Sequence, residues 1–145
     1  MKQELQDKLF EAFPLIFAEK DLSMQESCMY WGIACGDGWF DLVWDLCADL
    51  QIVADMDLIP QPVAAQVKEK FGGLRFCLNS HNDAVGALVG AAEELAWNTC
   101  ENCGSTEDIK TTRGYISRLC APCFGTIEER REAKWAEYEA GLKSD

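Results

Sequence analysis

The sequence is poor in histidine and, over a long stretch, in basic residues. It contains a single histidine, which argues against a histidine-rich metal centre and against an HNH-type nuclease. No lysine or arginine occurs between Lys20 and Lys68, whereas eight carboxylates do. A surface with that charge repels phosphate backbones, so the first two-thirds of the chain is not expected to bind DNA or RNA directly.

Long apolar runs are also absent. No run approaches the roughly 18 residues that a membrane-spanning helix needs, and the residues after Met1 form an amphipathic rather than an apolar segment. The sequence therefore predicts neither a membrane span nor a signal peptide. We expect a cytoplasmic protein, in which eight cysteines point to metal binding or free thiols before disulfides.

The composition otherwise fits one folded unit with an attached module. The chain has 145 residues, of which 48% are hydrophobic, and 13 basic and 25 acidic side chains give a net charge of −12. Residues 1–99 hold 6 basic and 16 acidic side chains, while residues 100–145 hold 7 and 9. We predict an acidic α+β core over residues 1–99 and a zinc module with a C-terminal helix over residues 100–145, packed on the core as one unit.

Hydrophobic periodicity predicts a helical N-terminal part followed by a central hairpin. Two runs with period two flank Gly72-Gly73 and predict a β-hairpin or a small sheet, although a helix over residues 63–70 is an open alternative. Residues 21–37 fit either a short buried strand or an ordered loop. Helices are predicted over residues 3–18 with a break at Pro14, over 39–54 with Asp37 as N-cap, and over 84–98.

The strongest chemical signal is a pair of C-x2-C motifs. Cys100 and Cys103 are separated by sixteen residues from Cys120 and Cys123. Zinc prefers four soft ligands in a tetrahedron, and two such pairs supply them without strain. Four thiolates leave no open position for water, so we predict a structural Zn²⁺ rather than a catalytic one. Redox motifs are the alternative, but the βαβ setting typical of them is missing from the pattern.

The residues between and after the two pairs suggest how the module folds. Gly104 follows the first pair and lets the backbone fold so that its amides point at the sulfurs. Residues 109–119 can form a hairpin that turns near Gly114, and Pro122 suits the first turn of a helix that carries the last ligand. A knuckle, a hairpin and a helix in that order predict a treble-clef-like module.

Four further cysteines and the single histidine match no common ligand spacing. We interpret the cysteines as buried thiols that pack like small hydrophobic side chains, and the histidine as part of a polar loop. These residues are Cys28, Cys35, Cys47, Cys77 and His81.

Aspartates recur every four residues along the helix predicted over 39–54 and so share one face. A solvated face is the simplest interpretation. A docking surface for a basic protein patch and a carboxylate site for a divalent ion are the alternatives. The partner-binding candidates are Asp37, Asp41, Asp45 and Asp49, extended along the chain by Asp55 and Asp57.

The last helix, predicted over about 122–141, combines a thin apolar stripe with many charges. The stripe includes Trp135 and Tyr138 and is expected to pack on the main domain. Nucleic-acid contact is not the favoured interpretation, and a modest basic face around the zinc is the only place where the sequence would allow it. Its candidate residues are Arg113, Arg118, Arg130 and Arg131.

Several sequence blocks stand out when they are taken together. The chain contains a Cys35-Gly-Asp-Gly-Trp block, a Val67-Lys-Glu-Lys-Phe-Gly-Gly-Leu-Arg-Phe76 block and the two cysteine pairs. In these it resembles a family of small, functionally uncharacterised proteins of tailed phages, prophages and bacteria. The family commonly has an aromatic residue at the position of Cys77, and sometimes histidine at that of Cys123. The resemblance implies a phage or prophage origin and hence a bacterial cytoplasm, but no activity.

A weaker similarity concerns the four-cysteine finger and the acidic character. Both are shared with small zinc-finger regulators that enter the secondary channel of RNA polymerase, although this chain lacks their long coiled coil.

The sequence thus predicts a non-enzymatic, zinc-containing binding protein. Its acidic surface is expected to engage a basic protein partner, for example to inhibit a host nucleic-acid-handling or defence enzyme. Two alternatives stay open. One is a zinc-finger transcription adaptor that contacts RNA polymerase or nucleic acid. The other is an enzyme that uses Asp37 and nearby carboxylates with a divalent ion.

Overall fold

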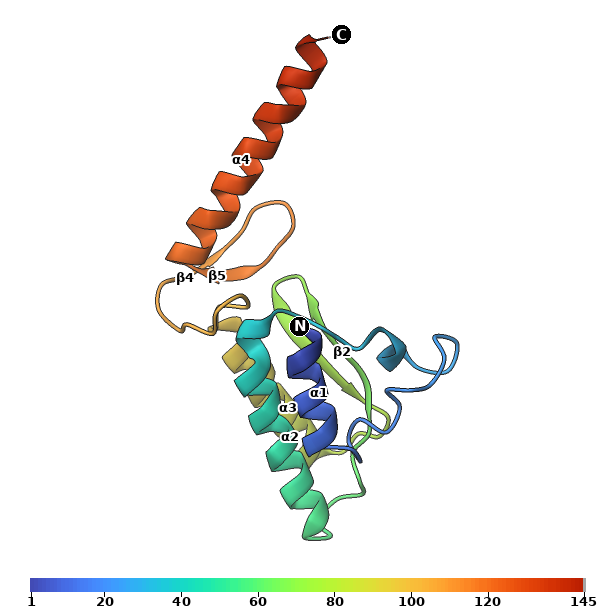
Figure 1. Cartoon of the computed structure of the whole chain (residues 1–145). Coiled ribbons are helices and arrows are strands. Elements are labelled where there is room, and N and C mark those ends of the chain that lie inside the picture. The colour runs from blue at the N-terminus through green and yellow to red at the C-terminus, as the bar shows by residue number, and fades with distance from the viewer. Residues whose placement is uncertain (145) are drawn as a thin grey trace.

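The protein has an α+β fold, as the sequence predicts (Figure 1). The computed structural model describes residues 1–144, so the last residue of the predicted 100–145 module lies outside the described residues. In chain order the elements are α1 (Gln3–Ala12), the 3-10 helix η1 (Cys28–Trp31), β1 (Ile33–Ala34), the 3-10 helix η2 (Asp37–Trp39), α2 (Phe40–Asp55), β2 (Ala64–Lys70), β3 (Gly73–Leu78), α3 (Asp83–Trp97), β4 (Ile109–Thr111), β5 (Arg118–Cys120) and α4 (Ala121–Lys143).

The central sheet has the strand order β1-β2-β3. Strands β2 and β3 form the predicted antiparallel hairpin, with Val67 opposite Phe76, and β1 adds to β2 in parallel. The alternative of a helix over residues 63–70 is therefore wrong. Phe71 and Gly72 make the turn, and both have positive φ, 53° and 83°. Two such residues match the primed turns that suit the twist of a hairpin.

The N-terminal helix ends before Pro14, as expected for a residue that cannot continue the helical hydrogen bonds. Asp37 does not cap α2: the residue at the N-cap is Trp39, and no side chain caps this helix. The carboxylate of Asp37 instead accepts a hydrogen bond from the Lys2 amide at 2.7 Å. A tertiary contact to the chain start thus replaces the expected local cap.

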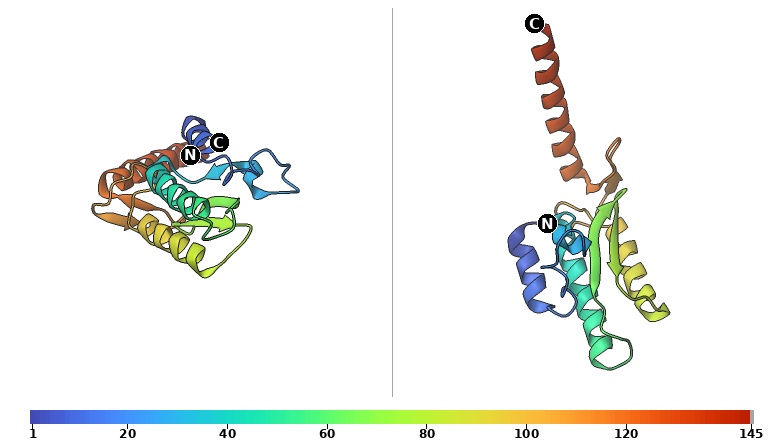
Figure 2. Two further views of the ribbon diagram at one scale, coloured as in Figure 1. Left: turned by 90° about the horizontal axis from the view of Figure 1, so that it is seen from below. Right: turned by 90° about the vertical axis from the view of Figure 1, so that its right-hand side faces the viewer.

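The main core lies between the central sheet and two long helices. Helix α2 contributes Val43 and Leu50 to this core, and the hairpin contributes Val67 and Leu74. All four residues are fully buried. Helix α3 packs against both α2 and β3, so α2 and α3 lie beside each other along one side of the hairpin (Figure 2). This pairing of helices forms the groove described below.

Helix α4 extends away from the rest of the protein (Figures 1 and 2). Its first turns pack on the module, where Phe124 and Ile127 contact a small cluster around Leu119. Its later apolar residues, Trp135 and Tyr138, are 62% and 59% exposed. The expectation that this stripe packs on the main domain is therefore wrong.

Candidate metal centre and adjoining acidic groove

The four cysteines predicted as ligands come together in one cluster. Cys100 and Cys103 lie in the loop after α3, Cys120 ends β5, and Cys123 lies in the first turn of α4. Their sulfur atoms all lie within 4.8 Å of one another, with 3.6 Å between Cys103 and Cys120. Zn–S bonds of about 2.3 Å in a tetrahedron place sulfurs about 3.8 Å apart. The cluster therefore has the size and donor set of a four-thiolate zinc site.

Local hydrogen bonds fold residues 100–105, which carry the first pair of ligands, into a tight turn of the kind called a zinc knuckle. The Cys100 amide donates to Ser105 O at 2.7 Å, and the Gly104 amide donates to Cys100 O at 2.9 Å. Gly104 has a φ of 83°, a left-handed conformation that glycine adopts without steric cost. The predicted hairpin and the following helix supply the second pair, and Pro122 lies in the first turn of α4.

Backbone amides and neighbouring sulfurs shift the thiol pKa values in opposite directions. Burial raises the pKa of Cys100, but amide donors of Cys120, Cys103 and Asn102 outweigh it and lower the pKa to about 7. At Cys120 an amide donor of Cys123 lowers the pKa, but burial and the adjacent sulfurs raise it to about 12. Four clustered thiols thus resist joint ionisation until a cation balances their charge, which Zn²⁺ does when bound.

The two glycines of the Gly36-Asp37-Gly38 turn allow the backbone of the knuckle to contact the backbone of the core directly. A Cβ on Gly38 would lie 2.2 Å from the carbonyl oxygen of Cys100, and one on Gly36 would lie 2.2 Å from that of Glu101. The Gly38 amide donates to Glu101 O at 2.8 Å. The sequence marked this segment only as a turn, because its partner lies more than sixty residues further along.

A buried tryptophan and a carboxylate complete this contact. Trp39 has no exposed side chain, and its Nε1 donates to Thr99 O at 3.0 Å. The Glu101 side chain accepts from the Gly36 amide at 3.0 Å, and burial raises its pKa. The zinc module is therefore held to the core by backbone contacts that tolerate no added side chain.

Two further contacts join the module to the end of α3 and to the central hairpin. Arg118 lies over the ring of Trp97, 4.5 Å from its centroid, and its Nε donates to Trp97 O at 2.8 Å. Tyr115 donates its hydroxyl to a Glu69 oxygen at 2.7 Å. The module thus contacts both the end of α3 and the tip of the β2–β3 hairpin.

The basic candidates are unequally placed. Arg118 is used in the contact with Trp97, and Arg131 donates to Arg113 O at 3.3 Å and pairs with Glu128 at 3.1 Å. The side chains of Arg113 and Arg130 are exposed. The four arginines therefore do not form one free basic surface.

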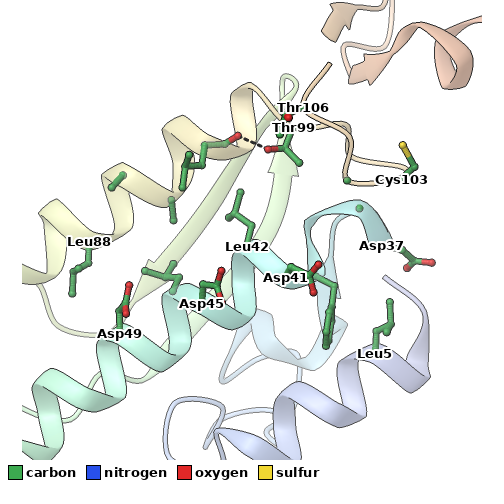
Figure 3. Close-up of a pocket in the computed structure, with 17 residues that line it drawn as sticks. Leu5, Asp37, Asp41, Leu42, Asp45, Asp49, Leu88, Thr99, Cys103 and Thr106 are labelled. Atoms are coloured by element: carbon green, nitrogen blue, oxygen red, sulfur yellow. Dashed lines mark hydrogen bonds between the residues drawn. The ribbon is translucent and has the colours of Figure 1, made fainter. Parts of the chain in front are cut away.

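A groove of about 570 Å³ lies between α2 and α3 and reaches the knuckle (Figure 3). Asp41, Asp45 and Asp49 follow one another along α2 and are exposed in the groove. The wall on α3 is apolar, with Leu88 and Leu95 prominent, and apolar side chains of α1 and α2 also line the groove: Leu5, Phe40, Leu42 and Leu46. Carboxylates and apolar side chains thus line the same depression.

The structure divides the six aspartates that the sequence grouped together. Asp37 also lines the groove, but its carboxylate lies 3.6 Å from Lys2 Nζ in addition to accepting the Lys2 amide. Asp55 and Asp57 lie at the far end of α2, outside the groove lining. The sequence could not reveal the apolar wall, because that wall depends on the pairing of α3 with α2.

The other reactive side chains are spread over the molecule. Cys35 and Cys47 are buried, as expected, but Cys28 and Cys77 are exposed, so the prediction of buried thiols is wrong for those two. His81 is exposed in the loop before α3. Across residues 1–144 the four-cysteine cluster is the one group of three or more possible ligands that converges.

Comparisons of the chain with protein-family models, with curated proteins and with solved structures found no match. Within residues 1–144, no helix combines the length and the apolar character that crossing a membrane requires. The metal centre defines a zinc-type four-cysteine module on an α+β core, and inference about function rests on the site itself.

Proposed function

We propose that the chain is a non-enzymatic, zinc-containing binding protein that engages a basic surface of a partner protein. The observation that carries this proposal is the groove in which Asp41, Asp45 and Asp49 face an apolar wall. A merely solvated acidic face needs no apolar surface opposite it, whereas protein partners commonly bury apolar side chains within a charged rim. Complementary charge also speeds association and fixes orientation.

The zinc has a structural role in this proposal. Its four ligands belong to a segment that buries only a small cluster around Leu119, so the metal supplies the stability that the module lacks. Among the described residues the groove carboxylates belong to no converging group of three or more possible ligands, and we propose no metal-dependent catalysis at them.

The resemblance to phage and prophage proteins extends the proposal to a biological setting. A bacterial host enzyme that handles nucleic acid presents a basic surface, and an acidic protein can occupy it. Inhibition of such an enzyme, including a defence enzyme, is the form of activity that we propose.

A matched pair of variants tests the binding surface. Asp41→Asn with Asp45→Asn removes two groove charges, whereas Asp55→Asn with Asp57→Asn removes two charges outside the groove. Affinity purification from a bacterial host, followed by mass spectrometry, should lose the specific partner with the first pair and keep it with the second. The same partners with both pairs would refute the proposed surface.

The nucleic-acid alternative has one supporting observation. Phe71 and Tyr115, 69% and 70% exposed, lie at a shared hollow beside Lys70. Aromatic side chains next to a cation can stack nucleobases. Binding of a fluorescent DNA or RNA oligonucleotide that weakens with salt and is lost when Phe71 and Tyr115 are both changed to alanine would favour this alternative.

A further inference from the structure

The groove combines an acidic rim on α2 with an apolar wall on α3. One rim carries Asp41, Asp45 and Asp49, all exposed. The opposite side carries Leu88 and Leu95, and Leu95 is 62% exposed to solvent. Figure 3 shows the three carboxylates in a row along α2, with Leu88 on the facing helix. An occupant must therefore present positive charge along one edge and apolar side chains along the next.

The spacing along the rim sets the repeat of the occupant. Carboxylates four residues apart on a helix are separated by about 6 Å, so Asp41 to Asp49 spans about 12 Å. Lysine or arginine side chains at i, i+4 on a helix have the same repeat. An occupant of about three to four turns fills the rim and reaches the knuckle end, which Cys103 and Thr106 line.

The hydrogen bonding of the wall backbones indicates whether the bound segment is helical or extended. Both long walls are helices, whose backbone groups are already hydrogen-bonded within α2 and α3. They offer no free strand edge, so an extended peptide would find no backbone partners along its length. A helix satisfies its own backbone and needs only side-chain contacts.

We propose that this groove binds an amphipathic helix of a partner protein, with basic residues along the aspartate rim and apolar residues against the α3 wall. This inference rests on the proposed function and specifies the partner's binding element. A second copy of the chain fits poorly, because residues 128–143 of the projecting helix carry five acidic and four basic side chains. The rim of three aspartates requires an excess of positive charge.

A designed peptide tests the inference directly on the zinc-loaded protein. The probe is an alanine-based helix of about four turns, with lysines at i, i+4, i+7 and i+11 and a leucine directly after each lysine. The control peptide has the same composition in an order that gives no amphipathic face. Fluorescence anisotropy of the labelled peptides measures binding, and the amphipathic peptide should bind about tenfold or more tightly.

Variants of the protein locate the binding. Asp41→Asn with Asp45→Asn should weaken the amphipathic peptide roughly two- to thirtyfold, whereas Asp55→Asn with Asp57→Asn should leave it unchanged. Leu95→Gln should weaken it about tenfold, because it removes an apolar contact from an exposed position without disturbing the core.

The outcomes separate this inference from the proposed function. Equal binding of both peptides, or no effect of Leu95→Gln, overturns the helical occupant, even if host partners still depend on Asp41 and Asp45. Host partners that ignore those two aspartates overturn the proposed function itself. Self-association that disappears in the Asp41/Asp45 variant, measured by sedimentation, would identify a second copy as the occupant and also overturn the inference.

Discussion

Replacing Gly38 with alanine should destabilise the protein strongly through one added methyl group. The new Cβ would lie 2.2 Å from Cys100 O, 2.6 Å from the Gly104 nitrogen and 2.7 Å from the Cys103 nitrogen. Ordinary contact begins at 3.4 Å, and all three neighbours are backbone atoms next to metal ligands. No side chain can rotate away, so the knuckle and the core must separate.

The expected loss follows from the contacts that this separation breaks. The hydrogen bonds from the Gly38 amide to Glu101 O and from Trp39 Nε1 to Thr99 O contribute about 0.5–1.5 kcal/mol each. Steric displacement of packed backbone adds about 1–3 kcal/mol. The free energy of unfolding should therefore fall by about 2–6 kcal/mol, a large part of the 5–15 kcal/mol typical of a domain.

A second glycine provides the matched control. Gly90 lies in α3, and apart from its chain neighbours and the backbone of its own helix no atom lies within 4 Å of its potential Cβ. Gly90→Ala should therefore stabilise the helix by about 0.5–1 kcal/mol. Urea denaturation followed by tryptophan fluorescence measures both variants in the zinc-loaded protein. A Gly38→Ala protein within about 0.5 kcal/mol of wild type would refute the interpretation of this segment as the docking point of the module.

Three other expected results follow from single features of the structure. Phe71→Asn should raise the free energy of unfolding, measured by urea denaturation, by about 1 kcal/mol. Asparagine tolerates the left-handed φ of 53° better than phenylalanine does, and the phenylalanine ring is mostly exposed. A loss of stability would show that the ring makes a necessary contact. In native, zinc-loaded protein a chromogenic disulfide reagent should modify the exposed thiols of Cys28 and Cys77 quickly but not the buried thiols of Cys35 and Cys47. Burial raises the pKa of Cys35 to about 12 and raises the pKa of Cys47 as well. Rapid modification of all four cysteines would contradict the burial of Cys35 and Cys47. Chelation should release one Zn²⁺ per chain and expose four further thiols, and clearly less than one zinc per chain would overturn the metal site.

Local patterns predicted the elements that depend on neighbouring residues. The C-x2-C pairs, Gly104 and Pro122 specify a knuckle and a helix start within a few residues, and the structure contains both. The alternation on either side of Gly72 likewise specified the hairpin, because side-chain periodicity and turn residues act over short distances.

Long-range contacts account for the expectations that were wrong. Asp37 had the sequence context of an N-cap, but its carboxylate accepts a hydrogen bond from the amide of Lys2 instead. Trp135 and Tyr138 had helical spacing, which predicts that they share a face without saying what covers it. The same limit applied to Gly38, whose requirement for glycine comes from Cys100, far along the chain.

The metal centre, the glycine turn and the groove are parts of one connected structure. Gly38 lines the groove and contacts the knuckle, and Cys103 and Thr106 close the same end of the groove. The other end, near Asp49 and Leu88, is built by α2 and α3 alone. Loss of the metal should therefore remove one end of the groove while leaving its charged rim in place. A partner helix that spans the whole groove would then sense the zinc module through the end that Cys103 and Thr106 line.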